Sequence, residues 1–174
     1  EFDGFGGLSA GASSRLLWDY PEEQREDILD FLFKPNFGAS LSINKVEIGG
    51  STASTDGSEP AISFDGENWV CSRGYENWLL SESKKRNPNI KTYGLSWGVP
   101  LWVANGTGSY YTEENINFHI KWLQCVRDTV QVDVDYIGVW NERSVTVGDL
   151  DWVVRFRNAM DQAGFESTKI VIPD

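Results

Sequence analysis

The chain has 174 residues and a mass of 19.6 kDa, of which 40% are apolar and 24% charged, a balance typical of a folded domain rather than a disordered one. Its 26 acidic and 15 basic side chains give a net charge of −11, which argues against nucleic-acid binding, because that needs clustered Lys and Arg. No apolar run approaches the roughly 18 to 20 residues that span a bilayer, and none resembles a secretory leader.

Strand and helix patterns alternate along the chain. The expected strands are residues 2–5, 41–48, 90–95, 136–140 and 169–172. The expected helices are residues 21–33, 75–85, 112–126 and 146–164. Gly6 and Gly7 are expected to end the first strand, and Thr112 and Thr146 to cap the last two helices. A polar stretch at residues 51–58 is a long loop, which at the end of a strand is more often functional than idle.

This alternation predicts an α/β fold with a parallel sheet. A complete (β/α)₈ barrel typically needs about 250 residues, so four βα units and a fifth strand predict the N-terminal half of such a barrel. A doubly wound open sheet of five strands fits the length as well, although the G-x-G-x-x-G turn that often marks it is absent. Composition alone leaves both architectures open.

The two cysteines, Cys71 and Cys125, lack the spacing of a metal site, and no cofactor is expected. A disulfide between them is one alternative, and a buried free thiol is the ordinary expectation for Cys125 within a helical pattern. Asn105 begins an N-glycosylation sequon, which supports a secretory route only weakly.

Catalytic groups in a barrel lie at the carboxyl ends of its strands. The candidates at these ends are Asp3, Glu47, Trp97, Asn141, Glu142 and Asp174. Residues 136–143 are the most specific stretch, because an apolar strand there delivers Asn141 and Glu142 directly to the barrel mouth. A glutamate at this place can act as the general acid and then the base of retaining glycoside hydrolysis, and the asparagine can donate to a sugar 2-hydroxyl. The alternative is a structural ion pair between Glu142 and Arg143 or another arginine.

The sequence resembles the galactocerebrosidase (galactosylceramidase) family, lysosomal retaining β-galactosidases of the Asn-Glu barrel superfamily. The matching stretches run in order across essentially the whole chain: FDGFGGLSAG, SRLLWDYPEEQREDILDFLFKPNFGASL, KVEIGG, TDGSEP, RGYENWL, KKRNPNI, GLSW and DYIGVWNERS. The resemblance implies that Glu142 is the acid/base and that Thr55, Trp97 and Asn141 contact galactose.

Without the resemblance, several of these residues have simpler interpretations. Thr55 is an ordinary turn residue, and Trp97 is as readily barrel filling as a stacking face for a sugar. Glu47 is expected to form an ion pair with an arginine or lysine rather than to catalyse. Trp102 and Trp140 are expected to serve packing.

The sequence also departs from the family. The family's nucleophile is a glutamate at the end of the seventh barrel strand, whereas the predicted strands here number five. Residues 61–64 lack the histidines that members can carry, and the family's β-sandwich and lectin-like domains have no counterpart. We therefore expect an N-terminal fragment that is inactive alone and folds poorly, since a half barrel leaves a sheet edge and an apolar inner face uncovered.

Two other functions compete with this interpretation. Residues 7–11 match the G-x-S-x-G nucleophile elbow, which would make Ser9 the nucleophile of a serine esterase, but the only histidine, His119, falls within a helical pattern. The second alternative is a sugar-binding barrel without catalysis.

The resemblance further implies galactosylceramide and related galactolipids as substrates, a lysosomal location and a saposin-type protein that presents the lipid. A pI of about 4.5 brings the net charge near zero at lysosomal pH, which eases peripheral contact with anionic membranes.

Overall fold

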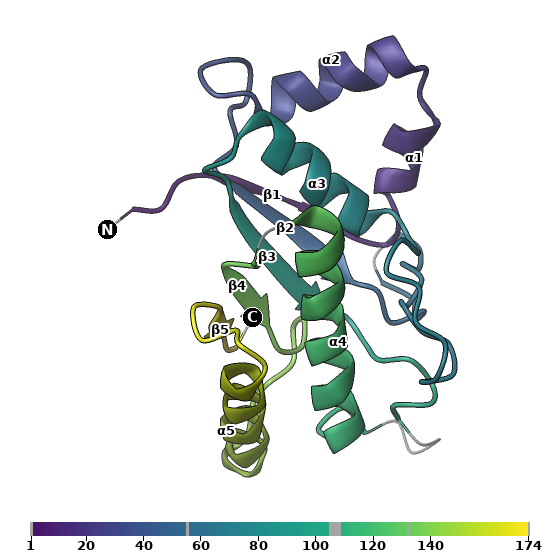
Figure 1. The fold of residues 1–174 in the computed structure, drawn as a ribbon, viewed down its shortest axis with the longest axis vertical. Helices are drawn as coiled ribbons and strands as arrows, with labels where there is room; N and C mark the ends of the chain where they lie inside the picture. Colours follow the sequence, from purple (N-terminus) through teal and green to yellow (C-terminus); the bar gives the residue numbers. More distant parts are fainter. Residues whose placement is uncertain (1, 55, 105–108, 132, 174) are drawn as a thin grey trace.

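The computed structural model of the protein describes residues 2–54, 56–104, 109–131 and 133–173. Five parallel strands form one sheet, and helices connect them (Figure 1). The strands are β1 (Gly6–Ser9), β2 (Ile43–Ile48), β3 (Lys91–Ser96), β4 (Tyr136–Gly138) and β5 (Lys169–Val171). The helices are α1 (Ser14–Asp19), α2 (Glu22–Phe33), α3 (Glu76–Arg86), α4 (Glu113–Val130) and α5 (Val147–Gln162).

The strand order decides between the two predicted architectures. Each strand pairs with the next one in sequence, giving the order β1-β2-β3-β4-β5. A doubly wound sheet reverses its order at one strand, whereas a (β/α)₈ barrel adds strands in sequence. The fold is therefore that of half a (β/α)₈ barrel, as the sequence predicted.

The first strand lies later than expected. Gly6 and Gly7 belong to β1 rather than ending it, and Phe2 and Phe5 are exposed ahead of it. A Cβ added at Gly6 would lie 2.7 Å from the Cβ of Ile43, so the close approach of β1 to β2 requires glycine there.

This shift removes Asp3 from the candidate strand ends. Asp3 precedes β1 and accepts a hydrogen bond from the Tyr136 hydroxyl at 3.2 Å, at the start of β4 rather than at the mouth of the sheet. The prediction that Asp3 lies at a strand's carboxyl end was wrong.

The other elements agree with the sequence to within a few residues, with two exceptions. The six-residue helix α1 was not predicted, because so short a segment shows little periodicity. The strand β4 ends at Gly138, two residues earlier than expected. Beyond it, the Val139 carbonyl accepts a hydrogen bond from the Tyr110 hydroxyl instead of pairing with a neighbouring strand.

The core lies between the helices and one face of the sheet. On β2, Asn44 points toward α3, where its amide donates to Ser83 Oγ at 3.1 Å. On β3, Gly94 leaves room for the ring of Trp122 from α4. Lys45 and Tyr93 lie on the opposite face, with the Lys45 ammonium 4.6 Å from the ring centroid. In a closed barrel this opposite face is the interior.

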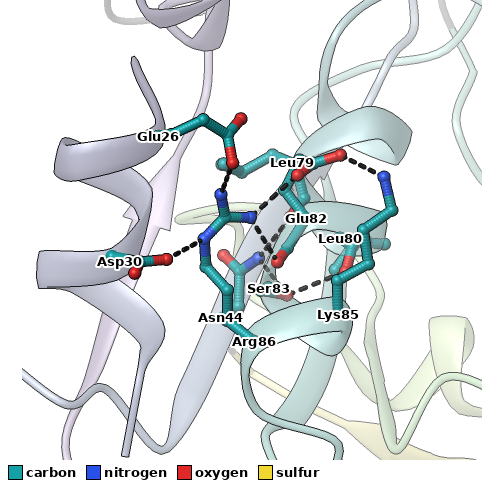
Figure 2. Close-up of polar contacts among 9 residues, drawn as sticks. All are labelled: Glu26, Asp30, Asn44, Leu79, Leu80, Glu82, Ser83, Lys85 and Arg86. Atoms are coloured by element: carbon teal, nitrogen blue, oxygen red, sulfur yellow. Dashed lines mark hydrogen bonds and ion pairs between the residues drawn. The ribbon is translucent and has the colours of Figure 1, made fainter. Parts of the chain in front are cut away.

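A charged network joins α2 to α3 (Figure 2). Arg86, whose side chain is 9% exposed, forms ion pairs with Glu82 and Asp30 at 2.8 Å and with Glu26. Lys85 forms a second ion pair with Glu82 at 2.5 Å. The buried guanidinium is thus matched by carboxylates from both helices.

Cys71 and Cys125 form a disulfide with an S–S distance of 2.02 Å, so the expectation of a buried free thiol was wrong. The chain before α3 packs against α4 and brings the two Cα atoms to 5.0 Å, within bridging range. Sequence spacing does not reveal this approach. Among the helices of the described residues, none is long and apolar enough to cross a membrane.

Candidate active site

The carboxyl end of β4 carries the most specific candidates. The backbone N–H of Asn141 donates to the Ser96 carbonyl at 2.8 Å, which holds Asn141 beside the end of β3. Glu142 follows with φ of 51°, in the left-handed region that residues other than glycine rarely adopt. Its side chain is exposed. Unfavourable backbone of this kind clusters at functional sites.

Trp97 lies directly beyond β3 and next to Trp140. The Trp140 indole donates to the Trp97 carbonyl at 3.0 Å, and its ring stacks on Tyr110 with centroids 4.4 Å apart. Trp140 therefore serves packing, as expected, but it also lines the pocket that Trp97 lines. Trp102 has the expected packing role, with its indole donating to the Ser63 carbonyl at 3.1 Å.

A pocket of about 580 Å³ opens between the loops that follow β2 and β3. Its walls are mainly apolar and aromatic, and include Gly50, Thr52, Phe64, Trp97, Leu101, Tyr110 and Trp140. A Cβ on Gly98 would lie 2.5 Å from Thr52 Oγ1, so glycine lets the two loops approach. A flat aromatic wall of this kind suits one face of a sugar ring.

The structure brings only part of the predicted site together. Glu142 lines a separate hollow of about 480 Å³ with Arg143 and Pro173, not the pocket of Trp97. Thr55, Asn105 and Asp174 lie outside the described residues.

Glu142 takes no part in the ion pairs of the described residues. The guanidinium of Arg143 lies 5.3 Å from the Trp140 ring centroid instead. The structure therefore gives no support to the alternative in which Glu142 serves only as an ion-pair partner of Arg143.

The surroundings of Glu47 differ from the expected ion pair. It is 1% exposed and makes no ion pair with a described residue. Its Oε2 accepts a hydrogen bond from the Gly11 amide at 2.6 Å. Burial raises its pKa, although the hydrogen bonds from Gly11 and Ser54 act in the opposite direction. The predicted ion pair with an arginine or lysine was wrong.

Two further glutamates, Glu59 and Glu76, are buried near Glu47, and sequence reasoning missed both. Burial raises the pKa of Glu59 to about 7, with Glu47 as a weaker contribution. Burial and the charge of Glu59 raise the pKa of Glu76 to about 8. In the sequence, Glu59 resembles a turn residue and Glu76 a first-turn helix residue, so neither pattern signals burial.

The serine-hydrolase alternative finds no geometry to support it. The Ser9 hydroxyl donates to Glu76 Oε1 at 3.0 Å. His119 is fully buried elsewhere, with Nδ1 2.8 Å from the Asn115 carbonyl, and burial lowers its pKa to about 4. Within the described residues, no group of three or more His, Cys, Asp or Glu side chains is arranged to hold a metal ion.

Comparison with known proteins agrees with this architecture. The chain is 49% identical over 177 residues to galactocerebrosidase of Danio rerio, covering 100% of this chain and 26% of that protein. In structure it is similar to SrfJ from Salmonella typhimurium, with a TM-score of 0.81, 17% identity and coverage of 98% of this chain and 43% of that one. The catalytic domain of the GH30 xylanase C from Talaromyces cellulolyticus gives a TM-score of 0.69 at 16% identity, over 96% and 45% of the two chains.

The structural similarities lie below 25% identity and show the fold alone. The chain spans about a quarter of the length of the curated relative that it matches. The model of glycosyl hydrolase family 59 matches residues 2–174, almost the whole chain. The chain therefore belongs to glycosyl hydrolase family 59.

Proposed function

We propose that residues 1–174 belong to the catalytic barrel of a retaining β-galactosidase that hydrolyses galactosylceramide to galactose and ceramide. The observation that carries the proposal is Glu142, held in left-handed backbone four residues beyond the end of β4, in a chain 49% identical to a galactocerebrosidase.

In the proposed mechanism Glu142 gives its proton to the glycosidic oxygen as that bond breaks. A glutamate from a later strand attacks the anomeric carbon and forms the glycosyl-enzyme. Glu142 then takes a proton from water, and the resulting hydroxide equivalent releases galactose. Asn141 donates to the 2-hydroxyl, and Trp97 and Thr55 contact the sugar.

The proposed domain is the first half of a barrel that closes with further strands. β1 and β5 are the two edges of the sheet. Leu8 on β1 is in register with Lys45, and its 54% exposed side chain lies on the face that becomes the interior of a closed barrel. β-sandwich and lectin-like domains follow in the family. We call the protein in which residues 1–174 continue into these parts the complete protein, and we expect residues 1–174 alone to be inactive.

The proposed setting is the lysosome, reached through the secretory pathway, with Asn105 as a glycosylation site. Galactolipids are the proposed substrates, and a saposin-type protein would present them from the membrane. The net charge of −11 and the pI of about 4.5 support an acidic compartment, because net repulsion from anionic lipid falls there.

A sugar-binding barrel without catalysis is the second candidate. It is favoured by the separation of Glu142 from the aromatic pocket, because Trp97 and Trp140 line one hollow and Glu142 another.

The change Glu142→Gln in the complete protein tests the assignment. Loss of the proton donor should cut galactosylceramide hydrolysis by more than about 100-fold, while the glycosylation step of a galactoside with a very good leaving group is largely spared. Glu166→Gln is the control, because Glu166 is exposed and precedes β5, at the opposite end of the sheet. Wild-type hydrolysis of galactosylceramide by Glu142→Gln would remove Glu142 from the mechanism.

A further inference from the structure

Glu47, Glu59 and Glu76, which we call the carboxyl cluster, come from three segments and meet behind the loops at the carboxyl ends of β1 and β2. Glu47 lies in β2, Glu59 in the segment that follows β2, and Glu76 in the first turn of α3. Their exposed fractions are 1%, 2% and 1%. Three carboxyl groups so far from water are costly when charged.

Hydrogen bonds connect the cluster to the segments of chain around it. Ser9 Oγ and Ser14 Oγ donate to Glu76 Oε1 at 3.0 and 2.9 Å. The amides of Tyr75 and Glu76 donate to Glu59 Oε1 at 2.7 and 3.2 Å. The cluster thereby joins β1 and its loop to α3.

Each glutamate also has one oxygen without a hydrogen-bond partner among the described residues. These oxygens are Glu47 Oε1, Glu59 Oε2 and Glu76 Oε2. An unpartnered carboxylate oxygen in a buried site is far less costly once the group carries a proton.

No cation compensates the cluster within the described part of the chain. None of the ion pairs among the described residues involves Glu47, Glu59 or Glu76. The contrast is Glu82 on the same helix, where burial acts against two cations, Lys85 and Arg86, and the pKa ends below its usual range (Figure 2).

The charged groups of the neighbouring elements have other partners. From α1, Arg15 pairs with Asp19 at 2.6 Å and donates to the Tyr75 hydroxyl. From β2, Lys45 lies over the Tyr93 ring.

From the chain before α3, Arg73 donates to the Ala61 carbonyl, and its guanidinium lies 4.0 Å from the Phe64 ring centroid. Asp56, in the segment after β2, is exposed. The polar groups that donate to the cluster are the hydroxyls of Ser9, Ser14 and Ser54 and the backbone amides of Gly11, Tyr75 and Glu76.

We propose that the carboxyl cluster positions the loops after β1 and β2 only while its glutamates hold extra protons, so that this part of the sheet's mouth is ordered in acid and loosens as pH rises. The two loops touch directly, because a Cβ on Gly11 would lie 2.8 Å from both the Gly57 amide and Ser54 Oγ. The segment after β2 also contains Thr55, so the consequence for galactose binding rests on the proposed function, whereas the ordering itself does not.

The direction of the pH dependence follows from linkage. The pKa values of Glu59 and Glu76 are raised to about 7 and about 8, so the folded state binds more protons than the unfolded state. Their contribution to the free energy of unfolding is therefore fully present below the unfolded pKa of about 4.3. It is lost as the pH rises through about 7 and about 8.

Amide hydrogen exchange of the complete protein at pH 5 and pH 8, corrected for intrinsic rates, tests the inference without using activity. Peptides from the β1 loop and from the segment after β2 should lose protection at least tenfold at pH 8. Glu76→Gln places a permanently neutral amide at the same position and should shrink this loss to less than threefold. Glu59→Gln is the second variant, and its Oε1 can still accept the Tyr75 amide.

Glu82→Gln is the matched control on α3, because it removes a buried carboxylate that has cations beside it. It should leave the tenfold loss in the β1 loop unchanged. Wild-type protection that is the same at pH 5 and pH 8 would overturn the inference, even if no variant folds. The inference would also be overturned if Glu76→Gln or Glu59→Gln lost as much protection at pH 8 as the wild type.

The kinetic consequence is separate. With a soluble galactoside, the wild-type KM should rise between pH 5 and pH 8 by a larger factor than the KM of Glu76→Gln. If KM rises by the same factor in both proteins while hydrogen exchange changes as expected, the cluster orders the loops but does not affect substrate binding.

Discussion

At the scale of single residues, Glu142 illustrates what a sequence motif can and cannot predict. An apolar strand followed by Asn-Glu was enough to place both residues beyond β4. The φ of 51° at Glu142 could not be predicted, because glutamate carries no preference for the left-handed region and the conformation costs on the order of 1 to 3 kcal/mol. The surrounding fold imposes it.

Burial is equally hidden at this scale. Glu47, Glu59 and Glu76 span 29 positions of the sequence. Each is buried by segments distant in the sequence, so its neighbours along the chain do not predict its burial. The strand-end rule found Glu47 because β2 is regular. It could not find Glu59 or Glu76, which lie in an irregular segment and in the first turn of a helix.

Trp97→Ala separates a sugar-contacting ring from a structural one. Trp97 is partly exposed and lines the aromatic pocket, so its loss should raise the KM for galactosides several-fold and leave the thermal midpoint nearly unchanged. Trp102→Ala is the control, because Trp102 packs edge-on against Trp69 and Phe118 and should lower the midpoint instead. If Trp97→Ala lowers the thermal midpoint strongly and leaves the kinetics per folded molecule unchanged, Trp97 serves packing rather than sugar binding.

At the scale of elements, the start of α4 was predicted more accurately than the start of β1. Thr112 was identified as a cap from its residue type, and its Oγ1 accepts the Asn115 amide at 3.1 Å. The glycines of β1 were misassigned because glycine usually ends a strand, and only the approach of Ile43 shows why it is needed within this one. A cap depends on local chemistry, whereas a strand depends on its neighbour.

Thr112→Ala should cost about 1 kcal/mol of stability, because it leaves one amide at the start of α4 without its acceptor. Hydrogen exchange of the Asn115 amide in the complete protein should accelerate, while the last turn of α4 is unaffected. Thr112→Ser keeps the acceptor oxygen and should behave as wild type. Equal exchange in Thr112→Ala and wild type would show that this cap contributes nothing to the helix.

At the scale of the whole molecule, the alternation of strands and helices predicted a parallel sheet but could not choose its strand order. A half barrel and a doubly wound sheet share the same alternation, and only the pairing of each strand with its successor distinguishes them. The disulfide was likewise beyond sequence reasoning. Cys71 and Cys125 are 54 positions apart, and their approach depends on how α4 packs beside the chain before α3.

The disulfide should contribute strongly to the stability of this part of the barrel. Closing a loop across 54 positions restricts the unfolded chain by about 4 kcal/mol in the loop-entropy treatment. Cys71→Ala with Cys125→Ala should therefore lower the midpoint of the transition in which the barrel unfolds by on the order of 5 °C, measured by calorimetry on the complete protein. Each single variant should lose nearly as much as the double variant, because either change removes the same bond. If one single variant alone accounts for the loss and the other is neutral, side-chain packing of that cysteine rather than the bond supplies the stability.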